Sequence, residues 1–138
     1  MVAFTKFNQF VEDIASEVHN FGADSFMVAL CASANAPVVT NSVLANLTQI
    51  SYANLSTRAL TLASSGQTSG VHTVDFNNLT LTASGAVAAF RYVVIYNDTP
   101  TSPADPLIAF ADYGADLTMA NTEQLAINFN ASGFFTLT

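Results

Sequence analysis

The strongest pattern of apolar and polar positions lies between residues 90 and 113. Two runs, FRYVVIY at 90–96 and LIAFADY at 107–113, are rich in β-branched and aromatic residues. The ten residues between them are rich in Asn, Asp, Thr and Pro, which are typical of loops. The pattern therefore predicts two antiparallel strands joined by a long loop. Because apolar residues fall on both sides of each run, we expect both faces of the pair to be covered.

A register for these two strands follows if Tyr96 lies opposite Leu107. Arg91 then lies opposite Asp112, and we expect the two side chains to form an ion pair. One face should pack on an opposing sheet, and the other on an N-terminal helix or on a neighbouring subunit. The same register pairs Val94 with Ala109, Ile95 with Ile108, and Val93 with Phe110.

A second pattern, near the start of the chain, has the period of an α-helix. One apolar stripe is formed by Phe7, Phe10, Val11, Ile14, Val18 and Phe21, with Glu12, Asp13 and Glu17 on the polar side. The spacing predicts an amphipathic helix over about residues 5–21. Thr5 or Asn8 would cap its start, and Gly22 would supply the left-handed residue that follows a helix end.

The remaining patterns predict short strands separated by turns. We expect strands at 25–32, 58–64, 71–76, 79–83, near 117–119, at 125–129 and at 135–137, with 71–83 forming a hairpin about Asn77 and Asn78 and 64–70 forming a flexible turn. Residues 43–50 fit either an irregular strand or a short helical turn. Turn signals every eight to twelve residues favour a mainly β fold, a β-sandwich or jelly roll, in one domain over residues 1–138. The sandwich would span about residues 25–138, after the helix.

Composition narrows the classes of partner. The chain is 51% hydrophobic and only 9% charged, with a mean hydropathy of +0.38 and a net charge of −7. Its only cations are Lys6, Arg58 and Arg91, too few to neutralise several phosphates, so we expect no nucleic-acid partner. Anionic membranes are disfavoured for the same reason, and no apolar run is long enough to span a bilayer. With so few charged residues, we expect the surface to be formed by Ser, Thr, Asn and Ala, and part of it to be buried in an assembly.

The sequence shows no catalytic signature, so we expect no enzyme activity, no cofactor and no metal. Cys31 alternates with apolar residues and fits a buried hydrophobic side chain. His19 and His72 are isolated histidines, for which a structural role is the usual one. The carboxylates of Asp98, Asp105, Asp112 and Asp116 lie in or beside predicted turns and could bind calcium. The alternative is that Asp98 and Asp105 form hydrogen bonds within turns and that Asp112 pairs with Arg91.

Three stretches carry a resemblance to a known family. FVEDIASEVHNFGAD at 10–24, FRYVVIYNDTP at 90–100 and PLIAFADYG at 106–114 resemble parts of small virion proteins of tailed bacteriophages. The resemblance implies a capsid cement or decoration protein, on the outer surface of the capsid, that bridges subunits of the major capsid protein. The resemblance identifies no catalytic residues in this chain. A location in the tail or a fibre is an alternative within the same family.

Contact with partners is expected at the helix and at the long loop. The candidates are Phe7, Phe10 and Ile14 from the helix and Asp98, Thr99, Pro100, Pro103 and Asp105 from the loop. Copies of the chain should also associate, and we favour a dimer over a trimer. The competing hypothesis is a receptor- or carbohydrate-binding jelly roll that uses Tyr52, Tyr92, Tyr96 or Tyr113, although the chain has no Trp for a sugar platform.

Overall fold

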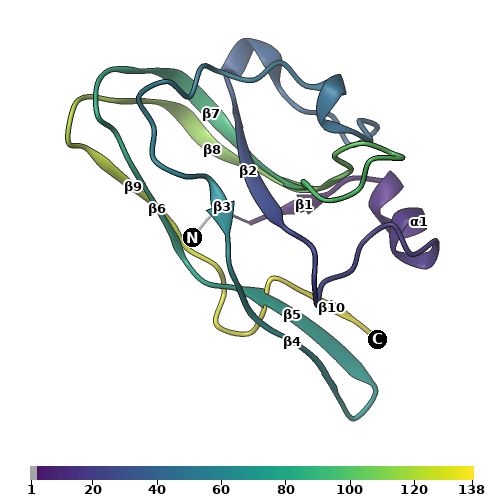
Figure 1. Ribbon diagram of the computed structural model, residues 1–138. Coiled ribbons are helices and arrows are strands. Elements are labelled where there is room, and N and C mark those ends of the chain that lie inside the picture. Colours follow the sequence, from purple (N-terminus) through teal and green to yellow (C-terminus); the bar gives the residue numbers. More distant parts are fainter. Residues whose placement is uncertain (1–2) are drawn as a thin grey trace.

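The predicted pair of long strands forms the centre of the largest sheet. Figure 1 shows the computed structural model, which describes residues 3–138. Five antiparallel strands lie in the order β1-β8-β7-β2-β3, with long β7 and β8 inside and two-residue strands at both edges. Their bounds are β1 Thr5–Lys6, β2 Phe26–Cys31, β3 Ala59–Leu60, β7 Val87–Asn97 and β8 Leu107–Met119.

Two smaller sheets lie across from this one (Figure 1). A three-stranded sheet has the order β10-β5-β4, and a two-stranded sheet pairs β6 with β9. Their bounds are β4 Leu62–Thr68, β5 Val71–Phe76, β6 Leu79–Thr82, β9 Gln124–Ile127 and β10 Phe135–Leu137. The main core takes side chains from all three sheets, so the chain is a mainly β protein with the layers of a β-sandwich. Strands grouped as five, three and two do not establish a jelly roll.

Both faces of the β7–β8 pair are indeed covered. Phe90 and Ile95 lie in the main core, whereas Val94 and Leu107 lie in a second buried cluster on the other face. Strand β2 alternates in the same way, with Phe26, Val28 and Leu30 on the main core side and Ala29 and Cys31 on the other. The second cluster is covered by Leu44 and Leu47, which lie in and beside a 3₁₀ helix at Leu44–Asn46. Within the chain, the second cover is thus formed by residues of the 44–47 segment and by Phe7, which precedes α1, whereas Phe10 and Ile14 of α1 pack on the main core.

The register of β7 and β8 differs from the prediction beyond the first pair. Tyr96 lies opposite Leu107 as expected, but an irregularity between Ile95 and Tyr96 moves the following pairs by one residue. Tyr92, rather than Arg91, is therefore opposite Asp112. The observed pairs are Ile95 with Ala109, Val94 with Phe110, and Val93 with Ala111.

The N-terminal helix is much shorter than the predicted 5–21. Helix α1 covers Gln9–Ala15, and the chain before it forms β1 on the edge of β8. Ser16 ends the helix, and Glu17 adopts the left-handed conformation with φ 61°. Val18 N donates to Asp13 O at 2.9 Å and Glu17 N to Ile14 O at 3.4 Å, which is the hydrogen-bond pattern of a Schellman motif. The left-handed residue is therefore Glu17, five positions before the expected Gly22.

Several local predictions were wrong because the short strands pair with partners other than the expected ones. Strands β5 and β6 exist as predicted but do not form a hairpin: β5 pairs with β4 and β10, and β6 pairs with β9. The expected flexible turn at 64–70 is mostly strand β4, and the expected short strand at 117–119 is the end of β8. Residues 43–50 contain the short helical turn, and a further 3₁₀ helix lies at Ser33–Asn35. The strands predicted at 25–32, 125–129 and 135–137 are confirmed.

Phenylalanine rings join α1 to the sandwich. Phe10 contacts Phe21 and Phe135 at ring-centroid distances of 6.2 and 5.4 Å, and Phe21 stacks on Phe26 at 4.8 Å. Phe4 continues the cluster to Phe134 at 5.2 Å. Residues near both ends of the described chain therefore meet in one aromatic cluster. Within residues 3–138, no helix is long and apolar enough to cross a membrane.

Candidate interaction surface

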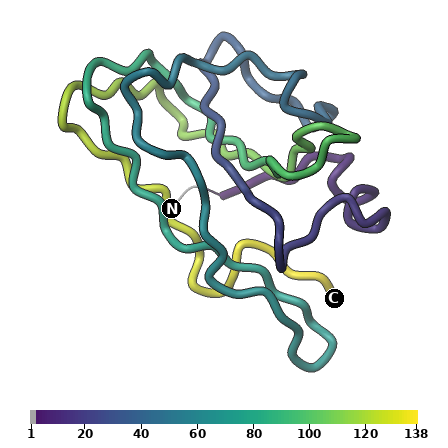
Figure 2. Tube along the Cα trace, in the orientation of Figure 1, coloured from purple at the N-terminus to yellow at the C-terminus, as the bar shows by residue number. Residues whose placement is uncertain are grey.

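The two predicted contact regions, the helix and the 97–106 loop, lie next to each other. The connection from α1 to β2 runs beside the loop (Figure 2). Its residues Ser16, Glu17, Val18 and Asn20 line a surface hollow together with Thr99 to Ser102. Asp98, Thr99 and Pro103 are exposed, while Pro100 and Asp105 are half-buried. The loop residues predicted for contact are therefore on the surface.

The helix residues predicted for contact are less accessible. Phe7 is completely buried and Phe10 is 5% exposed, whereas Ile14 is half-buried. Phe7 is buried because β1 adds to the edge of β8 and directs the next side chain into the second cluster, where its ring lies 5.0 Å from Phe110. Phe7 therefore cannot contact a partner without unfolding of this segment. Ile14 is the helix candidate that remains on the surface.

A buried polar cluster holds the loop against the α1–β2 connection. Asn97, at the end of β7, is fully buried, and its Nδ2 donates to Asp24 Oδ2 at 2.7 Å. Its Oδ1 accepts from Thr99 N at 3.1 Å, and Ser25 N donates to Thr99 Oγ1 at 2.8 Å. These bonds fix the first residues of the loop to the start of β2. A loop held in this way loses little conformational entropy when it binds.

His19 belongs to the same cluster. Its side chain is fully buried, and Asn97 Nδ2 donates to its Nδ1 at 3.1 Å. In the neutral imidazole the proton is therefore on Nε2, which faces Asp13 Oδ2 at 4.0 Å. Neither of these two atoms has a hydrogen-bond partner. Burial lowers the pKa of His19, and this effect outweighs the opposite influence of Asp13 and Asp24.

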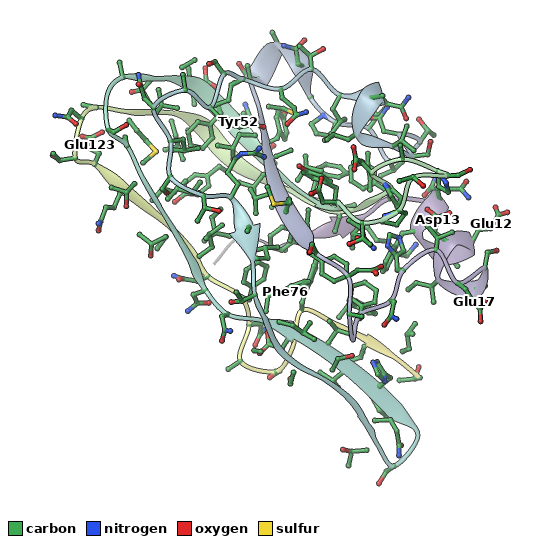
Figure 3. All side chains as sticks on the ribbon, in the orientation of Figure 1. Glu12, Asp13, Glu17, Tyr52, Phe76 and Glu123 are labelled. Carbon is green, nitrogen blue, oxygen red and sulfur yellow. The ribbon has the colours of Figure 1, made fainter. Side chains whose placement is uncertain are left out.

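The surface around the cluster is acidic. Glu17 and Asp24 border the hollow beside the loop, and Asp98 and Asp105 bracket the loop itself. Burial, together with the nearby Asp98, raises the pKa of Asp105. Figure 3 shows Glu12 and Asp13 on α1 and Glu17 just after it, gathered at one end of the molecule. No Lys or Arg lies within 4.0 Å of any of these carboxylates in the part of the chain that the structure describes.

The three cations lie elsewhere. Arg58 lies over the ring of Tyr52, 3.6 Å from its centroid, and donates to Val28 O. Arg91 forms the ion pair with Asp112, with Nε 2.7 Å from Oδ1, although the two residues are diagonal rather than directly opposite. The hydrogen bond from Arg91 lowers the pKa of Asp112. Lys6 lies exposed just before α1.

Strands β4 and β5 form a hairpin that extends away from the body (Figure 1). Strand β4 is the outer strand of its sheet, and its sequence LASSGQT contains no charged residue. Soluble proteins usually protect such an edge with charged side chains, proline or a bulge, because its free backbone groups can pair with another chain. The only irregularity of β4 lies at its start, between Leu62 and Ser64. The sequence does not predict this uncharged edge, because the composition of residues 64–70 fits a flexible turn.

Side-chain chemistry in the described residues is sparse. Ser65 Oγ lies 3.0 Å from His72 Nε2 across the β4–β5 hairpin, but no carboxylate lies within 4.0 Å of His72. Among residues 3–138, no group of three or more His, Cys, Asp or Glu side chains is placed to hold a metal ion. Cys31 is fully buried, and burial raises its pKa to about 11.

The tyrosines considered for sugar binding do not form one platform. Tyr52 lies under Arg58, and its hydroxyl donates to Gln49 Oε1 and accepts from Leu30 N. Tyr96 is 4% exposed, and Tyr92 is half-buried. Tyr113, 40% exposed, is the most accessible of the four.

Comparisons with other proteins found no similarity that identifies the chain. No protein-family model matches it, and neither the curated proteins nor the solved structures include a significant match.

Proposed function

We propose that this chain is a non-enzymatic structural protein of a tailed-bacteriophage virion. In this role it decorates the outer surface of the capsid and cements it by bridging subunits of the major capsid protein, with further contacts between its own copies. The resemblance of residues 10–24, 90–100 and 106–114 to such virion proteins suggests the class. The uncharged edge of the β4–β5 hairpin is the observation that carries the proposal.

That edge suits addition of a strand from a neighbouring subunit. Strand β4 is seven residues long, five of them exposed, and carries no charge to repel a second strand. Main-chain hydrogen bonds to such an edge supply affinity, and a hairpin that extends from the body can reach past the subunit that carries it. A cement protein needs contacts of this kind because it must span two capsid subunits.

The anchored 97–106 loop and its acidic surroundings support a second contact. The loop is held by Asn97 and Thr99, so it can meet a partner without being ordered first. The carboxylates at Asp98 and Asp105 favour Lys or Arg on the facing surface. They also favour an outer location, since packaged DNA would repel them.

Particles assembled with and without the chain test the proposal. We expect particles that carry it to withstand a higher temperature or a stronger osmotic shock, and electron cryomicroscopy to show it on the outer capsid surface. Equal stability of the two particles, or a location away from the capsid, would reject the cementing role.

A matched pair of variants tests the edge. Ser64→Lys places a charge on β4, whereas Ala88→Lys places the same charge on the exposed side of β7, inside the large sheet. Added to particles that lack the chain, the S64K protein should bind weakly and the A88K protein normally. Equal binding of both would show that β4 is not the contact.

A further inference from the structure

An apolar groove runs between α1 and β10. Phe10, Val11 and Ile14 form one side, and Phe135 and Leu137 form the other, over a hollow of about 260 Å³. Val11 is 56% exposed and Leu137 is 44% exposed, which makes them two of the five large apolar side chains that the described residues leave exposed. Exposed apolar side chains that border one groove are typical of a binding surface.

The two ends of this groove carry opposite charges. Lys6, just before α1, borders the groove at one end. At the other end Ile14, Phe135 and Leu137 also border a second hollow, which is lined by Glu17. Helix α1, which lies between these two residues in the sequence, has seven residues and is about 10 Å long. Neither Lys6 nor Glu17 has an oppositely charged side chain within 4.0 Å among residues 3–138.

A surface with an apolar centre and opposite charges at its two ends is complementary to itself. A twofold axis through the centre places the positive end of one copy against the negative end of the other. We propose that two copies of the chain associate through this groove, with their α1 helices antiparallel. Val11 and Leu137 of each copy then pack on the other copy, and Lys6 of each copy pairs with Glu17 of its partner.

The charge distribution favours a second copy over a different partner. A basic peptide would satisfy Glu17 but would meet Lys6, and an acidic peptide would do the reverse. A second copy satisfies both ends with the same two side chains, twice in each dimer. The inference shares with the proposed function only the expectation that copies associate. It is tested on purified protein without particles, so the two can fail separately.

Charge reversal tests the pairing. Sedimentation equilibrium of the purified chain should show a dimer, and Lys6→Glu or Glu17→Lys alone should weaken it about tenfold, because each change replaces two attractions per dimer by two repulsions. The double variant K6E/E17K restores opposite charges and should dimerise within about threefold of the original chain. Glu12→Lys makes the same charge change on α1 outside the groove and serves as the control for net charge.

The apolar centre is tested with a second matched pair. Val11→Asp should abolish the dimer, whereas Val38→Asp, at a position that is 52% exposed and outside the groove, should not. Circular dichroism checks that each variant is folded. The proposal is overturned by an original chain that stays monomeric at about 100 μM, which corresponds to a free energy of association weaker than about −5.5 kcal/mol. It is also overturned by a double variant no tighter than the single ones, or by V38D acting like V11D.

Discussion

Replacement of Asn97 by Ala is the sharpest test of the buried polar cluster. Asn97 is fully buried, and its side chain bonds to Asp24, His19 and Thr99. Loss of the charge-assisted bond to Asp24 should cost about 2 kcal/mol, and the acceptor left unpaired on the buried His19 about 1 kcal/mol more. Thr99 is exposed, so water can replace its lost partner. The total of about 3 kcal/mol is a large part of the stability of a domain of this size.

Urea unfolding followed by circular dichroism measures this loss. Asn77→Ala is the matched control, since Asn77 is exposed and its side chain donates to Thr61 Oγ1 at 3.0 Å. We expect N77A to lose less than about 1 kcal/mol. N97A should also be cut faster by proteases within the 97–106 loop, because the bonds to Asp24 and Thr99 fix its first residues. A loss of stability in N97A no greater than that in N77A would show that the cluster does not hold the loop.

Three further predictions concern single positions. Gly133 has φ 108°, and a Cβ there would overlap Thr73 Cγ2, so G133A should lower the free energy of unfolding by about 2 kcal/mol. The control G66A has open space at its Cβ and should change the free energy of unfolding little, so equal effects would contradict the geometry. Cys31 is buried and its pKa is raised to about 11, so it should react with a thiol reagent only as fast as the chain unfolds. Rapid labelling of the native protein would contradict this prediction and would show that the structure opens locally around Cys31. Burial holds the pKa of His19 below its ordinary 6.5, so the folded chain binds fewer protons than the unfolded chain. The contribution of His19 to stability is therefore complete above about pH 6.5 and falls as the pH drops below it. His19→Gln should flatten this pH dependence of the free energy of unfolding in urea, and an unchanged dependence would refute the role of His19.

The long strands could be predicted because their pattern is strong and local. Residues 90–96 and 107–113 are apolar on both sides, and only a pair of strands buried on both faces accommodates this. Their exact register could not be predicted, since the irregularity beside Tyr96 has no signature in the sequence. The partner of each short strand was also hidden. Asn77 and Asn78 fit a hairpin turn, yet they carry the chain from one sheet to another.

The end of helix α1 could not be predicted for a different reason. An apolar period of 3.6 continues through Val18 and Phe21, but the helix stops at Ala15 because Glu17 takes the left-handed conformation. Glu has no special preference for that conformation, so the pattern favoured Gly22. Phe21 still packs on the core, but from a loop, where it stacks on Phe26. An apolar period therefore predicts which side chains are buried better than it predicts the backbone that carries them.

The polar cluster could not be predicted at all. Asp13, His19, Asp24 and Asn97 come from the helix, the connection after it and the end of β7, and each fits an ordinary surface position in the sequence. Asp13 was assigned to the polar side of the helix, yet it is 4% exposed. Only the packing of the loop against the α1–β2 connection brings these side chains together. Sequence patterns carry no information on such contacts between distant polar residues.

The aromatic cluster has a consequence for the order in which the chain folds. Phe10 packs on Phe135 and Phe4 on Phe134, so α1 gains these contacts only after residues 134 and 135 have left the ribosome. A helix of seven residues is too short to be stable alone, so α1 should be fixed late, although it is made before β7 and β8. We expect a chain that stops after residue 130 to leave the amides of α1 open to hydrogen exchange while those of β7 and β8 are protected. Protection of α1 in that chain would show that it docks without residues 131–138.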